Sequence, residues 1–130
     1  MTAATDPARK TVLVADDEPY IGRIIQMKLE NGPYRVELAH DGREALDRLR
    51  GQDSIDLVLL DIMMPHASGL DVLAELRQLP HRSGTPVIML TAKGQEADRE
   101  LAAEYGATDF LTKPFSPKKL LARIDEIFDR

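Results

Sequence analysis

The chain has 130 residues, of which 43% are hydrophobic and 30% charged, an ordinary composition for one globular domain. Its formal net charge of −5 argues against a nucleic-acid-binding surface, and the absence of cysteine excludes disulfides and thiolate metal sites. We find no apolar run of the roughly 20 residues that a membrane helix requires and no secretory signal pattern. We therefore expect a cytoplasmic protein that does not bind membranes.

Strand-like and helix-like segments alternate along the chain. We expect a mobile N-terminal tail over residues 1–9 and one domain over residues 10–130. Strands are expected at residues 11–15, 34–39, 57–60, 86–90 and 108–111. Helices are expected from Pro19 to before Asn31, over 43–50, from after Gly69 to before Pro80, over 95–105, and from an N-cap at Ser116 onward. Five βα units in succession predict an α/β fold with a parallel sheet covered by helices on both faces.

For two of the helices, the sequence predicts which residues face the core. The first places Ile21, Ile24 and Ile25 on one inward face. The fourth has only Ala97, Leu101 and Tyr105 for its inward face. Because that face is thin in large apolar side chains, we expect the fourth helix to be among the least firmly packed.

Polar side chains follow four of the five predicted strands. Asp16 and Asp17 follow the first, Asp61 the third, Thr91 the fourth and Lys113 the fifth. Ligands of open α/β sheets bind outside the carboxyl ends of the strands. If these strands are neighbours in the sheet, the side chains therefore meet at one edge.

The charges at this edge predict a metal site. Three carboxylates and one ammonium sum to −2, and crowded carboxylates need a counter-ion to remain ionised. Oxygen ligands without a nearby His or Cys favour Mg²⁺, which completes its shell with water and phosphate oxygens. A carboxylate such as Asp61 can then act as the nucleophile of phosphoryl transfer, with Mg²⁺ and Lys113 neutralising the moving charge.

Taken together, these motifs resemble the receiver domain of two-component response regulators, the CheY-like superfamily. The motifs are Asp16-Asp17, Asp61 with Pro65 four residues later, Thr91-Ala92, and Lys113-Pro114-Phe115. Each motif is weak alone, but their shared order and spacing is specific and covers about residues 10–129. The resemblance implies a flavodoxin-like (βα)5 fold with strand order 2-1-3-4-5.

The resemblance also implies roles for individual residues. Asp61 is the phosphoacceptor, which receives its phosphoryl group from a histidine kinase or a histidine phosphotransfer protein. Asp17, Asp16 (directly or through water), Asp61 and the backbone carbonyl of Met63 hold Mg²⁺. Lys113 binds a phosphoryl oxygen and precedes a cis peptide bond to Pro114. Thr91 and the aromatic Phe110 form the switch that reports phosphorylation.

Most of these residues have a simpler explanation when each is considered alone. Asp16 and Asp17 suit the start of a helix, Thr91 suits a strand end, and Lys113 suits a solvated loop. Asp61 is harder to explain, because a carboxylate that ends a buried strand is costly without a partner. The histidines share no ligand spacing and are expected to be solvated: His40, His66 and His81.

Two other functions remain as alternatives. A small Mg²⁺-dependent phosphatase of the haloacid dehalogenase type needs a second Asp two residues after the nucleophile, but Met63 stands there. A flavodoxin-like nucleotide binder needs a glycine-rich loop after the first strand, but this chain has Asp16-Asp17-Glu18. We therefore expect a phosphoacceptor that assists its own phosphorylation and dephosphorylation rather than an enzyme.

The sequence leaves two possibilities for how such a receiver would pass on its signal. In the winged-helix branch of the family, the face formed by the fourth helix, fifth strand and fifth helix dimerises through three charge pairs. The matching pairs here are Asp109–Arg123, Arg99–Lys119 and Glu104–Asp125. Two of the three are like-charged, which disfavours a dimer and favours a stand-alone receiver. We expect a monomer when it is unphosphorylated, with a dimer of the phosphorylated form as an alternative. A receiver within a larger regulator, with a DNA-binding or catalytic output domain, remains the alternative.

Overall fold

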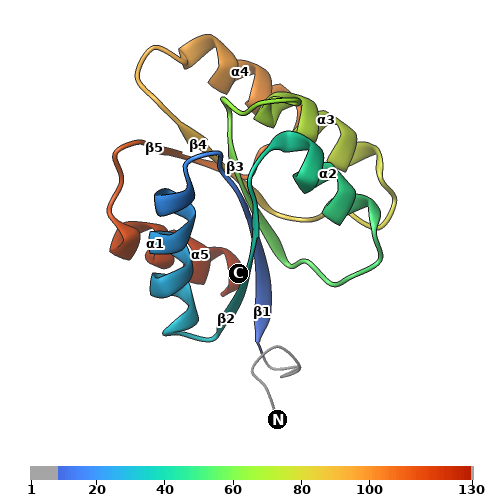
Figure 1. Ribbon diagram of the computed structural model, residues 1–130. Helices are drawn as coiled ribbons and strands as arrows, with labels where there is room; N and C mark the ends of the chain where they lie inside the picture. Colours follow the sequence, from blue (N-terminus) through green and yellow to red (C-terminus); the bar gives the residue numbers. More distant parts are fainter. Residues whose placement is uncertain (1–8, 130) are drawn as a thin grey trace.

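The computed structural model describes residues 9–129, so residues 1–8 of the expected tail and Arg130 lie outside the described residues. Five strands alternate with five helices in this part of the chain (Figure 1). The strands are β1 (Lys10–Ala15), β2 (Tyr34–Ala39), β3 (Leu57–Asp61), β4 (Val87–Thr91) and β5 (Asp109–Thr112). The helices are α1 (Pro19–Glu30), α2 (Gly42–Arg50), α3 (Gly69–Gln78), α4 (Glu96–Glu104) and α5 (Pro117–Phe128). None of the helices between residues 9 and 129 is long and apolar enough to cross a membrane.

The strands form one parallel sheet in the order β2-β1-β3-β4-β5, which confirms the predicted fold. Helices α1 and α5 cover one face, whereas α2, α3 and α4 cover the other (Figure 1). The sheet places β3 in the middle, with β1 on one side and β4 on the other. This order makes neighbours of β1, β3, β4 and β5, the strands that carry the candidate site.

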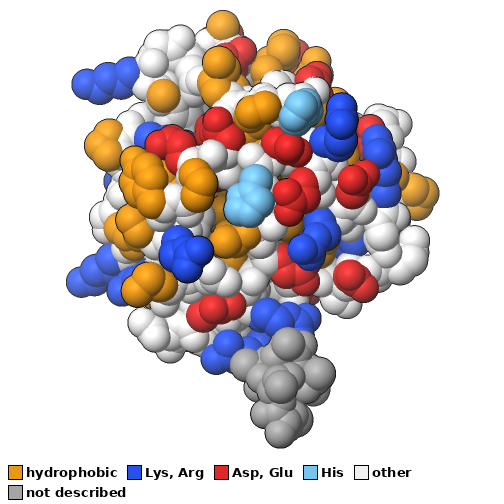
Figure 2. Space-filling view, in the orientation of Figure 1, with side chains coloured by type: hydrophobic (Ala, Val, Ile, Leu, Met, Phe, Trp, Pro, Cys, Tyr) orange, Lys and Arg blue, Asp and Glu red, His pale blue; other side chains and the backbone are white. Residues whose placement is uncertain are grey.

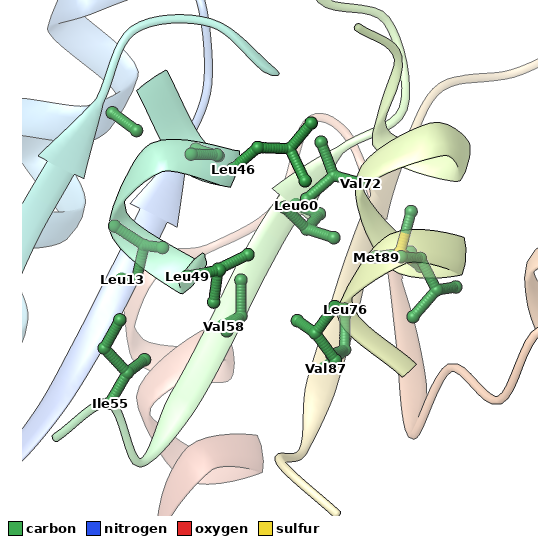
Figure 3. Packing of buried hydrophobic residues seen from close by; sticks show 14 of the residues in the cluster. Leu13, Leu46, Leu49, Ile55, Val58, Leu60, Val72, Leu76, Val87 and Met89 are labelled. Atoms are coloured by element: carbon green, nitrogen blue, oxygen red, sulfur yellow. The ribbon is translucent and has the colours of Figure 1, made fainter. Parts of the chain in front are cut away.

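The core has two layers because alternate residues of each strand point to opposite faces of the sheet. Leu13, Val58 and Leu60 pack under α2, α3 and α4 (Figure 3). Val12 and Leu59 pack under α1 and α5. Both sets are fully buried, which explains why these strands are continuously apolar in the sequence. Burial of each such side chain contributes roughly 1.5–3 kcal/mol.

Side-chain caps begin three of the helices. The Asp41 side chain accepts a hydrogen bond from Glu44 N at the start of α2. Ser68 and Asp71 form a reciprocal capping box at the start of α3. The predicted N-cap Ser116 is confirmed, since its Oγ accepts a hydrogen bond from the backbone N–H of Lys119. Such a cap contributes about 1 kcal/mol to helix stability.

The inward face predicted for α4 is wrong. Leu101 and Tyr105 are each 39% exposed and Ala97 is exposed, whereas Ala102 is the one fully buried residue of the helix. The helix is therefore rotated so that a small side chain meets the core. The predicted thin packing of α4 is confirmed by the same observation. Periodicity was misleading because the largest side chains of the helix lie outside the interface.

The loop between α3 and β4 is fastened to the end of α2, which the sequence did not reveal. Arg82 is only 4% exposed, and its guanidinium donates hydrogen bonds to the carbonyl oxygens of Leu49, Gly51 and Asp53. His81 is exposed, but its Nε2 lies 3.0 Å and 2.9 Å from the carbonyl oxygens of Leu49 and Gly51. The prediction of a merely solvated His81 therefore missed its contacts. A cation at the carboxyl end of a helix is favourably placed.

Candidate functional site

Three of the predicted site residues meet at the carboxyl edge of the sheet. Lys113, just beyond β5, places its Nζ 2.9 Å from Oδ2 of Asp16 and 3.1 Å from Oδ2 of Asp61. Asp16 follows β1, and Asp61 ends β3. Because these strands are parallel, their ends lie at the same edge. The sheet therefore produces the convergence that the sequence predicted.

Asp61 is held in a nearly closed environment. Its residue exposure is 6%, and its Oδ1 lies 3.4 Å from the backbone nitrogen of Met63. Gly69, the first residue of α3, packs directly behind it and donates a hydrogen bond to the carbonyl oxygen of Ile62 at 2.8 Å. A Cβ at residue 69 would lie 2.3 Å from the carbonyl oxygen of Asp61. The close approach of α3 to β3 therefore requires glycine.

The cluster of carboxylates at this edge differs in one residue from the predicted set of Asp16, Asp17 and Asp61. Carboxylate oxygens of Asp16, Glu18 and Asp61 all lie within 4.8 Å of one another. Asp17 is exposed and is not part of this group. Glu18 has an extended backbone, and side chains two residues apart on an extended chain share a side. That alternation was the available signal for pairing Glu18, rather than Asp17, with Asp16.

The charges of the site shift the pKa values of its residues. Burial, together with the nearby charge of Asp16, raises the pKa of the Asp61 carboxyl to about 6 despite the opposing effect of Lys113. Burial by itself would lower the pKa of the Lys113 ammonium, but its close contacts with Asp16 and Asp61 outweigh burial and raise it. Three carboxylate side chains surround the one ammonium group of Lys113, which gives the cluster a formal charge of −2.

A divalent cation fits these residues. Oδ1 of Asp16 accepts a hydrogen bond from the backbone nitrogen of Glu18 at 2.9 Å. Its Oδ2 is buried, and its polar contact among the described residues is the ion pair with the Lys113 ammonium at 2.9 Å. A buried carboxylate oxygen beside two more carboxylates provides the oxygen ligands that a hard cation such as Mg²⁺ prefers.

The predicted switch residues lie on the neighbouring strands β4 and β5. Thr91, at the end of β4, is 1% exposed and donates a long hydrogen bond of 3.5 Å to Oγ1 of Thr112. Its carbonyl oxygen accepts a hydrogen bond of 2.6 Å from the backbone N–H of Lys113. Phe110 is half-buried on β5, and the guanidinium of Arg99 lies 5.0 Å from its ring centre. The peptide bond between Lys113 and Pro114 is cis.

An apolar surface borders the site on the α1 side. Tyr20, Ile24 and Met27 are 62%, 45% and 66% exposed, so the prediction that Ile24 faces inward is wrong. Figure 2 shows hydrophobic side chains gathered over α1. A hollow of about 370 Å³ there is lined by residues that include Tyr20, Ile24, Lys113 and Phe115. The sequence did not predict this surface, because its periodicity placed Ile24 on the inward face of the helix and predicted nothing for Tyr20 or Met27.

Comparison with known proteins assigns the chain to a family. Residues 12–125 match the family described as the response regulator receiver domain. The chain belongs to this family. Receiver domains of response regulators are phosphorylated by histidine kinases, and the site residues described above lie within the matched range.

Curated relatives and solved structures agree with this assignment. The receiver is 50% identical over 119 residues to the transcriptional regulatory protein CpxR of Escherichia coli K12, covering 92% of this chain and 49% of that protein. The chain thus spans about half the length of the curated relatives it matches. The receiver domain of the Francisella response regulator 1452 has a TM-score of 0.84 and 34% identity, over 94% of this chain and 98% of that one. The receiver domain of the Pseudomonas aeruginosa histidine kinase PA1611, described with a magnesium ion in its active-site cleft, has a TM-score of 0.82 and 30% identity, over 92% and 97%.

Proposed function

We propose that this receiver accepts a phosphoryl group on Asp61 from the phosphohistidine of a histidine kinase or a histidine phosphotransfer protein in the cytoplasm. The observation that carries this proposal is the arrangement of Asp61 at the end of β3. Its carboxylate is nearly buried, 3.1 Å from the Lys113 ammonium and beside the carboxylates of Asp16 and Glu18. Family membership supports the same reaction.

Magnesium is the proposed cofactor. Asp16 and Asp61 would hold it, together with the Met63 carbonyl oxygen and Asp17 that the family resemblance implies. The structure offers Glu18 as a further carboxylate. When bound, Mg²⁺ neutralises charge on the transferring phosphoryl group. The magnesium ion of the PA1611 receiver domain supports this assignment.

In the proposed reaction, a carboxylate oxygen of Asp61 forms a bond to phosphorus as the bond between phosphorus and the donor histidine nitrogen breaks. The products are an aspartyl phosphate and a histidine imidazole. Asp61 must be ionised to attack, and its pKa of about 6 leaves it mainly ionised at neutral pH. Lys113 already lies 3.1 Å from the acceptor carboxylate and would bind an oxygen of the transferred group.

The proposed signal passes from Thr91 to the face formed by α4, β5 and α5. The hydroxyl of Thr91 makes only a long bond to Thr112, so it can turn toward a phosphoryl oxygen at little cost. Phe110 would then turn inward and α4, the thinly packed helix, would shift. Phosphorylation therefore biases a two-state element rather than building a new one.

The apolar surface of α1 is the proposed docking site for the phosphodonor. A donor histidine must reach Asp61, so the donor protein must cover the surroundings of Lys113. Tyr20, Ile24 and Met27 offer exposed apolar area immediately beside that opening. Apolar patches of this kind mark protein interfaces.

We propose a stand-alone receiver, which acts by binding a partner and is not an enzyme in its own right. Three members of the predicted dimer pairs form contacts within this chain. Arg123 binds Asp109 at 2.6 Å. Asp125 accepts a hydrogen bond from the Tyr34 hydroxyl. The alternative is the receiver part of a larger transcriptional regulator, which the name and length of CpxR favour.

Phosphorylation of purified protein by acetyl phosphate and Mg²⁺ tests the acceptor. We expect a phosphorylated species on a phosphate-affinity gel, and none with Asp61→Asn. Asp17→Asn and Glu18→Gln form a matched pair that identifies the metal ligand, because each replaces one neighbouring carboxylate by its amide. Phosphorylation of the Asp61→Asn variant at the wild-type rate would refute the proposed acceptor.

Light scattering with Mg²⁺ and beryllofluoride, an acyl-phosphate mimic, tests the stand-alone assignment. We expect a monomer with and without the mimic, with mimic binding verified by calorimetry. A dimer that forms with the mimic, and not with Asp61→Ala, would instead favour a receiver from a dimerising regulator.

A further inference from the structure

We infer that the α4–β5–α5 face binds an acidic segment of a partner protein, with Arg99, Lys119 and Arg123 as its cationic contacts. The inference rests on the proposed function, which makes this face the output surface. It adds the chemical class of the partner. Neither family membership nor the names of the relatives specifies that class.

A hollow of about 420 Å³ between α4, β5 and α5 provides the site. Its lining includes Arg99, Phe110, Thr112, Ser116, Lys119 and Arg123. Three of the lining residues are cationic, and none of those that the structure describes is a carboxylate. Two hydroxyl groups, on Thr112 and Ser116, add hydrogen-bonding capacity. The hollow is therefore suited to bind carboxylate groups, which can accept hydrogen bonds from both the cationic side chains and the hydroxyl groups.

The positive charge of this hollow is poorly compensated from within the chain. Arg123 is paired with Asp109 at 2.6 Å, but neither Arg99 nor Lys119 forms an ion pair with any described residue. The first turn of α5 holds no acidic residue, so Lys119 adds its charge to the positive end of that helix. Glu96 and Glu100 line an adjoining hollow that shares Arg99 and Phe110 with this one, but neither glutamate forms an ion pair with Arg99.

The same charges disfavour other occupants. A second copy docked through this face in the family's dimer arrangement would place Lys119 opposite Arg99, which costs affinity. A nucleic acid requires an extended basic surface, whereas Arg99, Lys119 and Arg123 are confined to one hollow. A short acidic protein segment can contact these three cations within the hollow without extending over Glu96 and Glu100.

Contact between Arg99 and Phe110 makes the site sensitive to the switch. The guanidinium lies 5.0 Å from the ring centre, close enough for a cation–π interaction. If Phe110 turns inward on phosphorylation, Arg99 loses this partner and becomes available to a carboxylate. The acidic segment should therefore bind the activated receiver more tightly, since it has differential affinity for the two states.

Selection of random peptides on the full chain loaded with Mg²⁺ and beryllofluoride tests the inference. We expect the selected peptides to be enriched in Asp and Glu. Measured by fluorescence anisotropy, Arg99→Glu and Lys119→Glu should each weaken their binding about tenfold or more. Arg99→Lys and Lys119→Arg should retain most of it. Arg23→Glu, an exposed charge reversal on α1, is the matched control and should leave affinity unchanged.

Several outcomes would overturn the inference. They are peptides without acidic enrichment, no selected binder, or affinity that is insensitive to Lys119→Glu. Tighter binding of duplex DNA to the same residues, or a beryllofluoride-induced dimer that covers the face, would assign a different occupant. Phosphorylation of Asp61 is measured in parallel. Acidic peptides that bind a receiver unable to accept phosphate would refute the proposed function and leave the inference standing.

Discussion

Helices α3 and α4 lie side by side on one face of the sheet, yet they are attached to it very differently (Figure 1). Helix α3 buries Val72, Leu73 and Leu76 completely and begins with a capping box. Helix α4 fully buries only Ala102, and its N-cap residue makes no side-chain hydrogen bond to the helix. Local opening requires little free energy where few apolar contacts are lost.

This difference divides the molecule according to function. Helix α3 begins at Gly69, directly behind the proposed acceptor Asp61. Helix α4 follows Thr91 and contacts Phe110 through Arg99. The proposed chemistry is therefore built on a firmly packed region, where geometry must be constant. The proposed signal is carried by a loosely packed region, where a small bias in free energy suffices to shift a population.

The largest expected effect tests the packing difference itself. Leu73→Ala should lower the free energy of unfolding by roughly 2–5 kcal/mol, since it empties a site in the closed core. Leu101→Ala, the same change on α4, should cost well under about 1 kcal/mol because that side chain is 39% exposed. Urea unfolding of both variants measures the contrast. Equal destabilisation would show that α4 is as firmly packed as α3.

A second prediction tests the close approach of α3 to β3, the strand that ends in the proposed acceptor Asp61. Gly69→Ala should destabilise the protein by about 1–3 kcal/mol or more, because the new Cβ would lie 2.3 Å from backbone. It should also slow phosphorylation of Asp61 by acetyl phosphate. Gly84→Ala is the matched control, since its Cβ meets no atom within 4 Å. A normal phosphorylation rate in Gly69→Ala would mean that α3 does not set the acceptor geometry.

The raised pKa of Asp61 predicts a dependence of stability on pH. The folded-state pKa of about 6 exceeds the ordinary value of 3.8, so this group makes the metal-free protein less stable as pH rises from about 4 to about 6. Asp61→Asn removes this loss and should raise the free energy of unfolding at pH 7.5 by about 1–3 kcal/mol, with little effect at pH 4.

Urea unfolding in EDTA at the two pH values measures the difference between wild type and Asp61→Asn. Other titrating groups cancel in that difference as long as they titrate alike in both proteins. A gain of equal size at both pH values would contradict the assigned pKa. Added Mg²⁺ should stabilise the wild type more than the variant, because a ligand that binds the folded state stabilises it.

Thr91→Ala should have the smallest effect on stability. It is also the most direct test of the proposed difference in function between the α3 and α4 regions. This variant should still accept phosphate on Asp61. In wild type, beryllofluoride should change the amide hydrogen exchange of α4 and leave that of α3 nearly constant. In Thr91→Ala the change in α4 should be largely lost. An undiminished response would show that another residue couples Asp61 to α4.

Sequence reasoning succeeded where a feature depends on local chemistry. The apolar runs predicted the strands, and Ser116 predicted the start of α5. It was less successful with side chains whose directions depend on packing, such as Ile24, Leu101 and Arg82. Periodicity shows that a helix has an apolar side, but the neighbouring elements decide which residues of that side are covered.

The sequence by itself determined the βα alternation and, through the shared spacing of Asp16, Asp61, Thr91 and Lys113, the family. These features follow from residue type and chain order, which survive any rotation of a side chain. Only the tertiary structure decided that Glu18 joins the carboxylates and that Arg99 covers Phe110. Both depend on how strand ends and helices are placed in space, because side chains distant in the chain acquire their partners only when the sheet and its helices pack.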